Sequence, residues 1–162
     1  MPVVSGAEFL KAARKGGYAV GGYNTNNLEW TQAILEAAEA KKAPVLIQTS
    51  MGAAKYMGGY KVAKDMITNL VDSMNITVPV AIHLDHGDYE AALECIEVGY
   101  TSIMFDGSHL PFEENLKLAK DVVEKAHAKG ISVECEVGSI GGEEDGIIGT
   151  GELADIEECK QM

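Results

Sequence analysis

The sequence lacks long apolar runs: no stretch approaches the roughly 20 residues that a membrane-spanning helix needs. Its start, Met1-Pro2-Val3-Val4-Ser5, has no basic region followed by an apolar stretch, so no signal peptide is indicated. Cysteine is also scarce. Cys95, Cys135 and Cys159 form no CxxC pair, so we expect small apolar side chains rather than disulfides, and a cytoplasmic location.

Positive charge is scarce as well. Lys and Arg number 13 against 25 Asp and Glu, which gives a net charge of −12. Nucleic-acid binding needs clustered Lys and Arg, so no nucleic-acid partner is predicted, and no membrane partner either. A small anionic substrate is not excluded, because one pocket can differ in sign from the whole chain. The sequence also contains no GxGxxG after the first expected strand and no GxxxxGK[ST] motif, so the usual nucleotide-binding loops are missing.

What the sequence does contain is a fivefold alternation of short β-type runs with helical stretches. The expected strands are 18–23, 44–48, 78–84, 101–105 and 131–137. Strands that alternate with helices form a parallel sheet with right-handed crossovers, so the fold class is α/β. The sheet is expected to be either doubly wound or part of a (β/α)8 barrel. A closed barrel needs about 250 residues, and this chain has 162.

The helices have recognisable start signals and apolar faces. Ser5-Gly6-Ala7-Glu8 and Asn26-Asn27-Leu28-Glu29 are typical of capping boxes, and Asp88 is expected to cap a short helix that ends at Gly99. Helical character resumes near Ile156. The faces expected to pack inward are Trp30, Ile34, Ala37 and Ala38; Ala63, Met66, Ile67, Leu70, Val71 and Met74; and Leu116, Ala119, Val123 and Ala126.

Polar and titratable residues follow every expected strand. In parallel α/β folds the functional site lies at the carboxyl ends of the strands, so these residues are the candidates for a site. They are Asn24, Ser50, His83, Asp85, His86, Asp106, Ser108, His109, Glu134 and Glu136.

His83-Leu84-Asp85-His86 is the densest cluster. Strand alternation places His83 and Asp85 on one face and His86 elsewhere, unless the strand ends there, which Gly87 permits. One interpretation is an acid/base beside a metal ligand. The alternative is an aspartate that caps the next helix beside a solvated histidine.

Asp106 and Glu136 each follow an apolar strand, where a carboxylate buried without a partner would be costly. Such a carboxylate can be stabilised by binding a metal or by pairing with arginine, and the scarcity of arginine favours a metal. The segment 141–146 is a glycine-hinged acidic loop. It is interpreted either as a solvated loop or as a lid that carries a carboxylate into a closed site.

Four motifs in order, YNTNN at 23–27, AIHLDHG at 81–87, FDGSH at 105–109 and VECEVG at 133–138, together with GGEED at 141–145, resemble the class II zinc-dependent fructose-bisphosphate aldolases. The likeness covers essentially the whole chain and is greatest to the enzymes of Gram-positive bacteria. It implies a TIM barrel, of which residues 1–162 are the incomplete N-terminal portion with about the first five βα units.

The activity that the resemblance implies is reversible cleavage of fructose 1,6-bisphosphate to dihydroxyacetone phosphate and glyceraldehyde 3-phosphate, in glycolysis and gluconeogenesis. Zinc polarises the ketone and stabilises the enediolate, and it occupies two positions in the family. His86 matches the zinc-binding histidine. Asp106 and Glu136 match the carboxylates that hold zinc at its second, outer position.

The remaining roles also come from the resemblance. Asp85 matches the acid/base that handles the aldehyde-side hydroxyl, and Glu144 matches the carboxylate that moves the proton at the nucleophilic carbon. Asn24 and Ser50 match polar groups near the aldehyde half of the substrate. The complete enzyme is expected to be a homo-oligomer, either a dimer or a tetramer.

One departure is severe. The family's zinc site needs two further histidines, from a GxxHG and an HGG segment, and neither segment is in this sequence. We therefore expect the isolated chain to be inactive and to expose an apolar sheet edge. Two other hypotheses stay open: a tagatose-bisphosphate aldolase, and a non-catalytic half-barrel that self-associates through its open edge.

Overall fold

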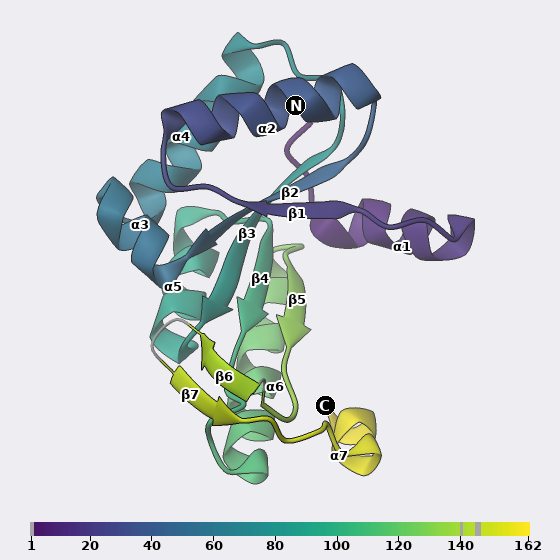
Figure 1. Cartoon of the computed structure of the whole chain (residues 1–162), viewed down its shortest axis with the longest axis vertical. Coiled ribbons are helices and arrows are strands. Elements are labelled where there is room, and N and C mark those ends of the chain that lie inside the picture. The colour runs from purple at the N-terminus through teal and green to yellow at the C-terminus, as the bar shows by residue number, and fades with distance from the viewer. Residues whose placement is uncertain (1, 140, 145–146) are drawn as a thin grey trace.

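The computed structural model describes residues 2–139, 141–144 and 147–162 (Figure 1). Its main sheet is parallel, and its five strands are ordered as they occur in the chain. This order excludes a doubly wound sheet, whose strand order reverses at a switch point. The strands are β1 (Gly21–Asn24), β2 (Val45–Ser50), β3 (Val80–Gly87), β4 (Ser102–Phe105) and β5 (Ser132–Cys135).

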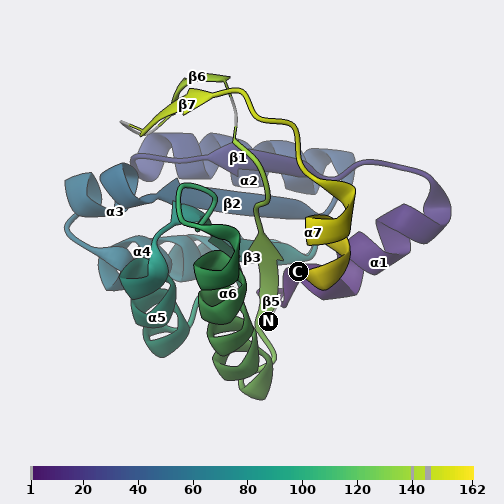
Figure 2. The same cartoon turned by 90° about the horizontal axis from the view of Figure 1, so that it is seen from below.

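Each of the first four strands is followed by a helix that packs on the outer face of the sheet, where α5 and α6 lie side by side (Figure 2). These helices bury a continuous apolar core against Ile47, Ile82, Ile103 and neighbouring strand residues. The helices are α1 (Gly6–Gly16), α2 (Leu28–Lys41), α3 (Met51–Met57), α4 (Tyr60–Ser73), α5 (Tyr89–Val98), α6 (Phe112–Ala128) and α7 (Ile156–Gln161).

The opposite, inner face of the sheet is closed at one end by α1. Phe9 of this helix packs against Leu46 and Ala81, which alternate with the outward-facing core residues along β2 and β3. Gly6 lies so close to the start of β4 that a Cβ there would be 3.2 Å from the Ser102 hydroxyl oxygen. Helix α1 thus covers the amino-terminal half of the inner face, and the predicted site residues follow at the carboxyl ends of the strands.

Most helix starts agree with the predicted signals. Asn27 and Asp88 each accept a hydrogen bond from a backbone amide in the first turn of their helices, 2.9 Å from the Trp30 amide and 2.8 Å from the Ala91 amide. Ser5 precedes α1 as expected, but its side chain makes no capping bond. Helix α3 was not expected.

Two of the predicted inward faces need correction. In α2 the buried residues are Thr31, Leu35 and Ala38, whereas Trp30 is 52 % exposed. Thr31 tolerates burial because its hydroxyl donates to the Asn27 carbonyl at 2.8 Å. In α6, Val122 rather than Val123 is fully buried. The face predicted for α4 is confirmed, because each of its residues is buried or partly buried.

The segment after β5 contains a two-stranded antiparallel hairpin, β6 (Gly141–Glu144) and β7 (Ile147–Thr150), where only a loop was expected. It lies on the carboxyl-terminal side of the main sheet (Figure 1). Gly138 at its base approaches the returning chain closely, since a Cβ there would be 2.8 Å from the Glu152 carbonyl oxygen. No helix in the described ranges combines the length and apolarity that a membrane crossing requires.

Candidate metal and catalytic site

The end of β3 presents Asp85 and His86 at the same edge of the sheet, which simple strand alternation would not do. The pairing of β3 with β4 shifts register between Leu84 and Gly87, and His86 has a left-handed backbone, with φ of 46°. The sequence predicts that Asp85 and His86 share a site only if the strand ends there. However, the strand continues to Gly87. A local irregularity turns the histidine instead.

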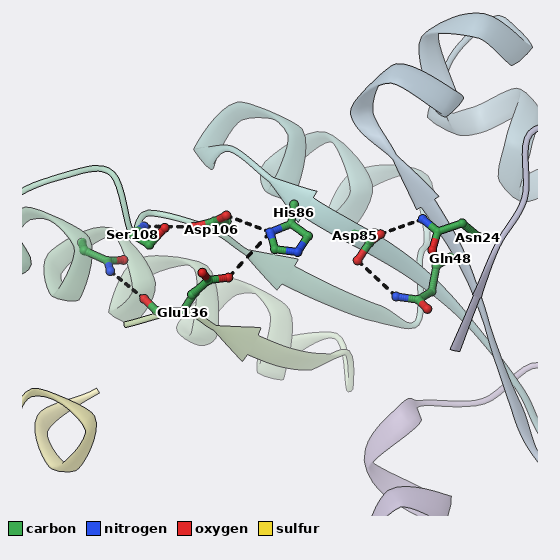
Figure 3. Close-up of polar contacts among 8 residues, drawn as sticks. Asn24, Gln48, Asp85, His86, Asp106, Ser108 and Glu136 are labelled. Carbon is green, nitrogen blue, oxygen red and sulfur yellow. Dashed lines mark hydrogen bonds and ion pairs between the residues drawn. The ribbon is translucent and has the colours of Figure 1, made fainter. Parts of the chain in front are cut away.

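The carboxylates that follow β4 and β5 converge on His86 (Figure 3). The His86 Nδ1 atom lies 2.8 Å from Asp106 Oδ2 and 3.7 Å from Glu136 Oε2. All three side chains are largely buried, and one ligand atom from each lies within 4.8 Å of the others. One imidazole nitrogen and two carboxylate oxygens are donors that zinc accepts, so the donor set fits this ion.

The surroundings of Asp106 favour its ionised form. Burial opposes its ionisation, but hydrogen bonds from His86 and from the Ser108 hydroxyl and amide outweigh it, so the pKa of Asp106 lies below its usual value. The Ser108 amide donates to Asp106 Oδ1 at 3.0 Å, which leaves Oδ2 directed at His86. A negatively charged oxygen therefore faces the centre of the three-residue group.

Asp85 lies on the other side of His86 and is held by two side-chain amides, one from β1 and one from β2 (Figure 3). Asn24 Nδ2 donates to Asp85 Oδ2 at 2.7 Å, and Gln48 Nε2 donates to Oδ1 at 3.1 Å. Gln48 was not among the residues predicted from the sequence. The available signal was its position two residues before Ser50, which places it on the same strand face.

Space for Gln48 comes from a glycine on the adjacent strand. A Cβ on Gly22 would lie 2.3 Å from Gln48 Oε1, so any side chain there would displace the amide. Ser50 is the register partner of Asp85, and its hydroxyl caps α3 by accepting from the Ala53 amide at 3.2 Å. Asn24, Ser50 and Asp85 are therefore brought to one side of the site.

His83 is not part of this arrangement. It is 2 % exposed and its Nδ1 lies 2.8 Å from the Ser102 hydroxyl. Burial lowers the pKa of His83 to about 4, so the ring is neutral near pH 7. His109 is exposed and Glu134 is largely exposed, and neither belongs to the group of three ligand donors.

Two other predictions fall on or near the hairpin. The backbone of Glu144 belongs to β6, but its side chain lies outside the described part of the chain, as do Asp145 and Gly146. Cys135 points away from the site into the helix-side core, as strand alternation predicted, and burial raises the pKa of its thiol to about 11. Cys159 is exposed and so does not act as a core residue.

Comparison with known proteins places the chain among aldolases. Residues 4–162 match the family model described as "Fructose-bisphosphate aldolase class-II". The chain is 83% identical to the fructose-bisphosphate aldolase of Streptococcus pneumoniae over 162 residues, 100% of this chain and 55% of the relative. It is 54% identical to that of Geobacillus stearothermophilus over 164 residues, 100% of this chain and 57% of the relative.

Among solved structures, the YdjI aldolase of Escherichia coli K12 superimposes with a TM-score of 0.76 at 31% sequence identity, over 84% of this chain and 51% of that one. The chain thus spans about half the length of the relatives it matches. The predicted fold is confirmed: the five parallel strands and their helices are five βα units of a TIM barrel.

Proposed function

The chain belongs to the class II fructose-bisphosphate aldolase family, and we propose that it supplies the first five βα units of an enzyme that reversibly cleaves fructose 1,6-bisphosphate. The products are dihydroxyacetone phosphate and glyceraldehyde 3-phosphate. In this proposal residues 1–162 are one part of a single barrel domain, and the remaining strands and zinc-binding histidines come from outside this sequence.

The observation that carries the proposal is the convergence of His86, Asp106 and Glu136 beside a carboxylate, Asp85, that amides hold in place. These three residues would hold zinc, at one or two positions. Bound zinc would polarise the substrate carbonyl and offset the negative charge that develops on its oxygen.

The chain's own residues would handle protons and orientation. Both oxygens of Asp85 accept amide hydrogens, so its position at the strand edge is set before substrate arrives. From there Asp85 can take the proton of the hydroxyl at the aldehyde side during cleavage and return it during condensation. Asn24 and Ser50, which flank it, would orient the aldehyde half, and Glu144 would move the proton at the nucleophilic carbon.

The rest of the barrel has a surface to pack on. Between β1 and α2 lies an apolar groove of about 380 Å³, lined by residues that include Tyr23, Ile34, Ala37 and Pro44. The adjacent edge of β1 has no partner strand among the described residues. We propose that the complete enzyme closes this edge, works in the cytoplasm and assembles as a homo-oligomer.

The test is to complete the barrel. The chain is joined to the part of the Streptococcus pneumoniae relative that follows the matched residues, and cleavage of fructose 1,6-bisphosphate is followed by coupling the triose products to NADH oxidation. We expect turnover by this completed barrel, loss of turnover in EDTA, recovery with Zn²⁺ and none from the 162-residue chain alone. Turnover by the isolated chain, or a folded completed barrel that is inactive with zinc, would refute the proposal.

Two controls sharpen the result. Asp85→Asn keeps the shape of the side chain but removes the acid/base, so it should abolish turnover without preventing folding. Parallel rates on tagatose 1,6-bisphosphate decide the stereochemical preference. A stable, discrete dimer of the chain together with an inactive completed barrel would favour the self-associating half-barrel instead.

A further inference from the structure

Asn115 is a polar residue in a place where an apolar one would be expected. It lies in the first turn of α6 and is only 2 % exposed, among apolar neighbours such as Leu116 and Ala119. Asparagine is a poor helix former, and burying its amide costs free energy unless hydrogen bonds compensate. Its Oδ1 has no hydrogen-bond partner among the described residues, so only part of that cost is offset.

The bond that Asn115 does make reaches the metal-ligand group. Its Nδ2 donates to the main-chain carbonyl of Glu136 at 2.9 Å. The last paired residues of β4 and β5 are Phe105 and Cys135, so Glu136 lies one residue beyond the ladder that holds its strand in place. The side chain of Asn115 therefore provides a bond from α6 to the chain just beyond the end of this ladder.

The other end of the same amide contacts the loop after β4. A Cβ on Gly107 would lie 2.4 Å from Asn115 Oδ1, so the buried backbone next to Asp106 packs directly on this side chain. The Asp106 amide in turn donates to the Gly87 carbonyl at 2.9 Å, which ties this loop to β3 beside His86. The segments that carry His86 and Asp106 are thus joined by main chain, and beyond the last β4–β5 pair the segment that carries Glu136 is joined to them through Asn115.

We propose that Asn115 is a positioning residue, which sets the distance between the Asp106 and Glu136 carboxylates by bridging the backbone segments that carry them. The inference deepens the proposed function, because it concerns the same metal-ligand group. Carbonyl oxygens only accept hydrogen bonds, so the residue must present a donor to Glu136. An aspartate of the same shape cannot do so, and it would set a negative charge against the carbonyl.

The test uses the 162-residue chain and two variants at this position, Asn115→Asp and Asn115→Leu. Val122→Ala is the matched control, because it removes buried atoms from the same helix about two turns further along. Co²⁺ serves as the probe, with affinity measured by calorimetry and coordination followed by visible absorption. Both Asn115 variants should lose affinity by about 10- to 100-fold, as expected for residues that orient ligands, and should change the absorption band. The control should keep the parent's affinity and band.

A measurement without metal tests the role of Asn115 independently of the proposed metal site. Amide hydrogen exchange in metal-free protein should accelerate at 107–108 and 136–138 in Asn115→Leu more than in the rest of the chain, whereas Val122→Ala should show no such local excess. Failure of the parent to bind Co²⁺ would count against a metal site made by His86, Asp106 and Glu136 alone, and the exchange data would still decide on Asn115. Parent-like exchange in Asn115→Leu, or parent-like Co²⁺ binding by both Asn115 variants, would overturn the positioning role.

Discussion

The Asp85 carboxylate depends on side chains from two other strands of the sheet. Gln48 Nε2 donates to one oxygen and Asn24 Nδ2 to the other, and Gly22 leaves room for the Gln48 amide. A hydrogen bond to a charged group is worth more than one between neutral groups, and losing it frees the carboxylate to rotate. The orientation of the proposed acid/base is therefore set by β1 and β2 together.

Replacing Gln48 should consequently slow the reaction. In the completed barrel, Gln48→Leu is expected to lower kcat by about tenfold or more, because one charged hydrogen bond contributes about 1.5–3 kcal/mol. Gln48→Glu should be worse, since it sets a second carboxylate against Asp85. Gln161→Leu, on the exposed surface of α7, is the control. Parent-like kcat in Gln48→Leu would contradict the assigned role.

Glu39 illustrates a different use of a carboxylate, far from the site. It accepts hydrogen bonds from the Lys42 ammonium and from the Thr77 amide and hydroxyl, and these contacts, led by Lys42, lower the pKa of Glu39 from 4.5 to about 2. A carboxylate with a depressed folded-state pKa stabilises the fold above its unfolded-state pKa. That stabilisation is lost as the pH falls from about 4.5 through 2.

We therefore expect Glu39→Gln to be less stable than the parent at pH 6, with the difference shrinking as the pH is lowered into that window. Urea unfolding of the chain at several pH values measures it. Glu36→Gln, an exposed position on the same helix, should show no comparable trend. A difference that stays constant with pH would mean that the ionised form of Glu39 is not what stabilises this corner.

Helix α2 owes its start to its cap. Asn27 accepts from the Trp30 amide with its side chain, and its carbonyl accepts from the buried Thr31 hydroxyl. This geometry orients the helix directly after β1, next to Asn24. The capping signal before α1 has no such bond, because the Ser5 hydroxyl does not reach the first turn.

The two capping residues should therefore contribute differently to the free energy of unfolding. Asn27→Ala is expected to reduce the free energy of unfolding by about 1 kcal/mol, and Asn27→Asp should retain most of the stability because it keeps the acceptor. Ser5→Ala should change little. Chemical denaturation of the three variants provides the comparison, and equal losses from Asn27→Ala and Ser5→Ala would show that side-chain capping is not the cause.

The molecule as a whole is a curved sheet with apolar surface beside its first strand. Tyr23 is 55 % exposed and Trp30 is 52 % exposed, and Trp30 shares a helix face with Ile34 and Ala37 of the groove between β1 and α2. Apolar residues gathered at an unpaired strand edge mark a surface that another segment covers.

The single tryptophan reports on that surface. Joining the chain to the rest of the barrel should shift Trp30 emission to shorter wavelength and reduce its quenching by acrylamide, because the indole leaves water. Any tryptophan in the added segment is first replaced by phenylalanine, and mixing the chain with an unrelated protein controls for non-specific effects. An unchanged spectrum in an active completed barrel would show that the missing segment does not cover the α2 face.

Local pattern was sufficient for much of the fold and for the list of site candidates. Apolar runs and caps depend on neighbouring residues, so the five strands, the starts of α2 and α5 and the inner face of α4 could be predicted. Functional sites lie at the carboxyl ends of the strands in a parallel sheet, which explains why Asp85, His86, Asp106 and Glu136 were among the candidates that the sequence provided.

Tertiary structure decided the rest, because contacts between distant segments have no local signature. The register shift in β3 turns His86 toward two carboxylates that lie 20 and 50 residues further along the chain, at Asp106 and Glu136. Gln48 and Asn115 look unremarkable in the sequence and acquire their roles only from what packs beside them. The open groove, which leaves Trp30 outside the core, likewise depends on which neighbours the sheet has rather than on helical periodicity.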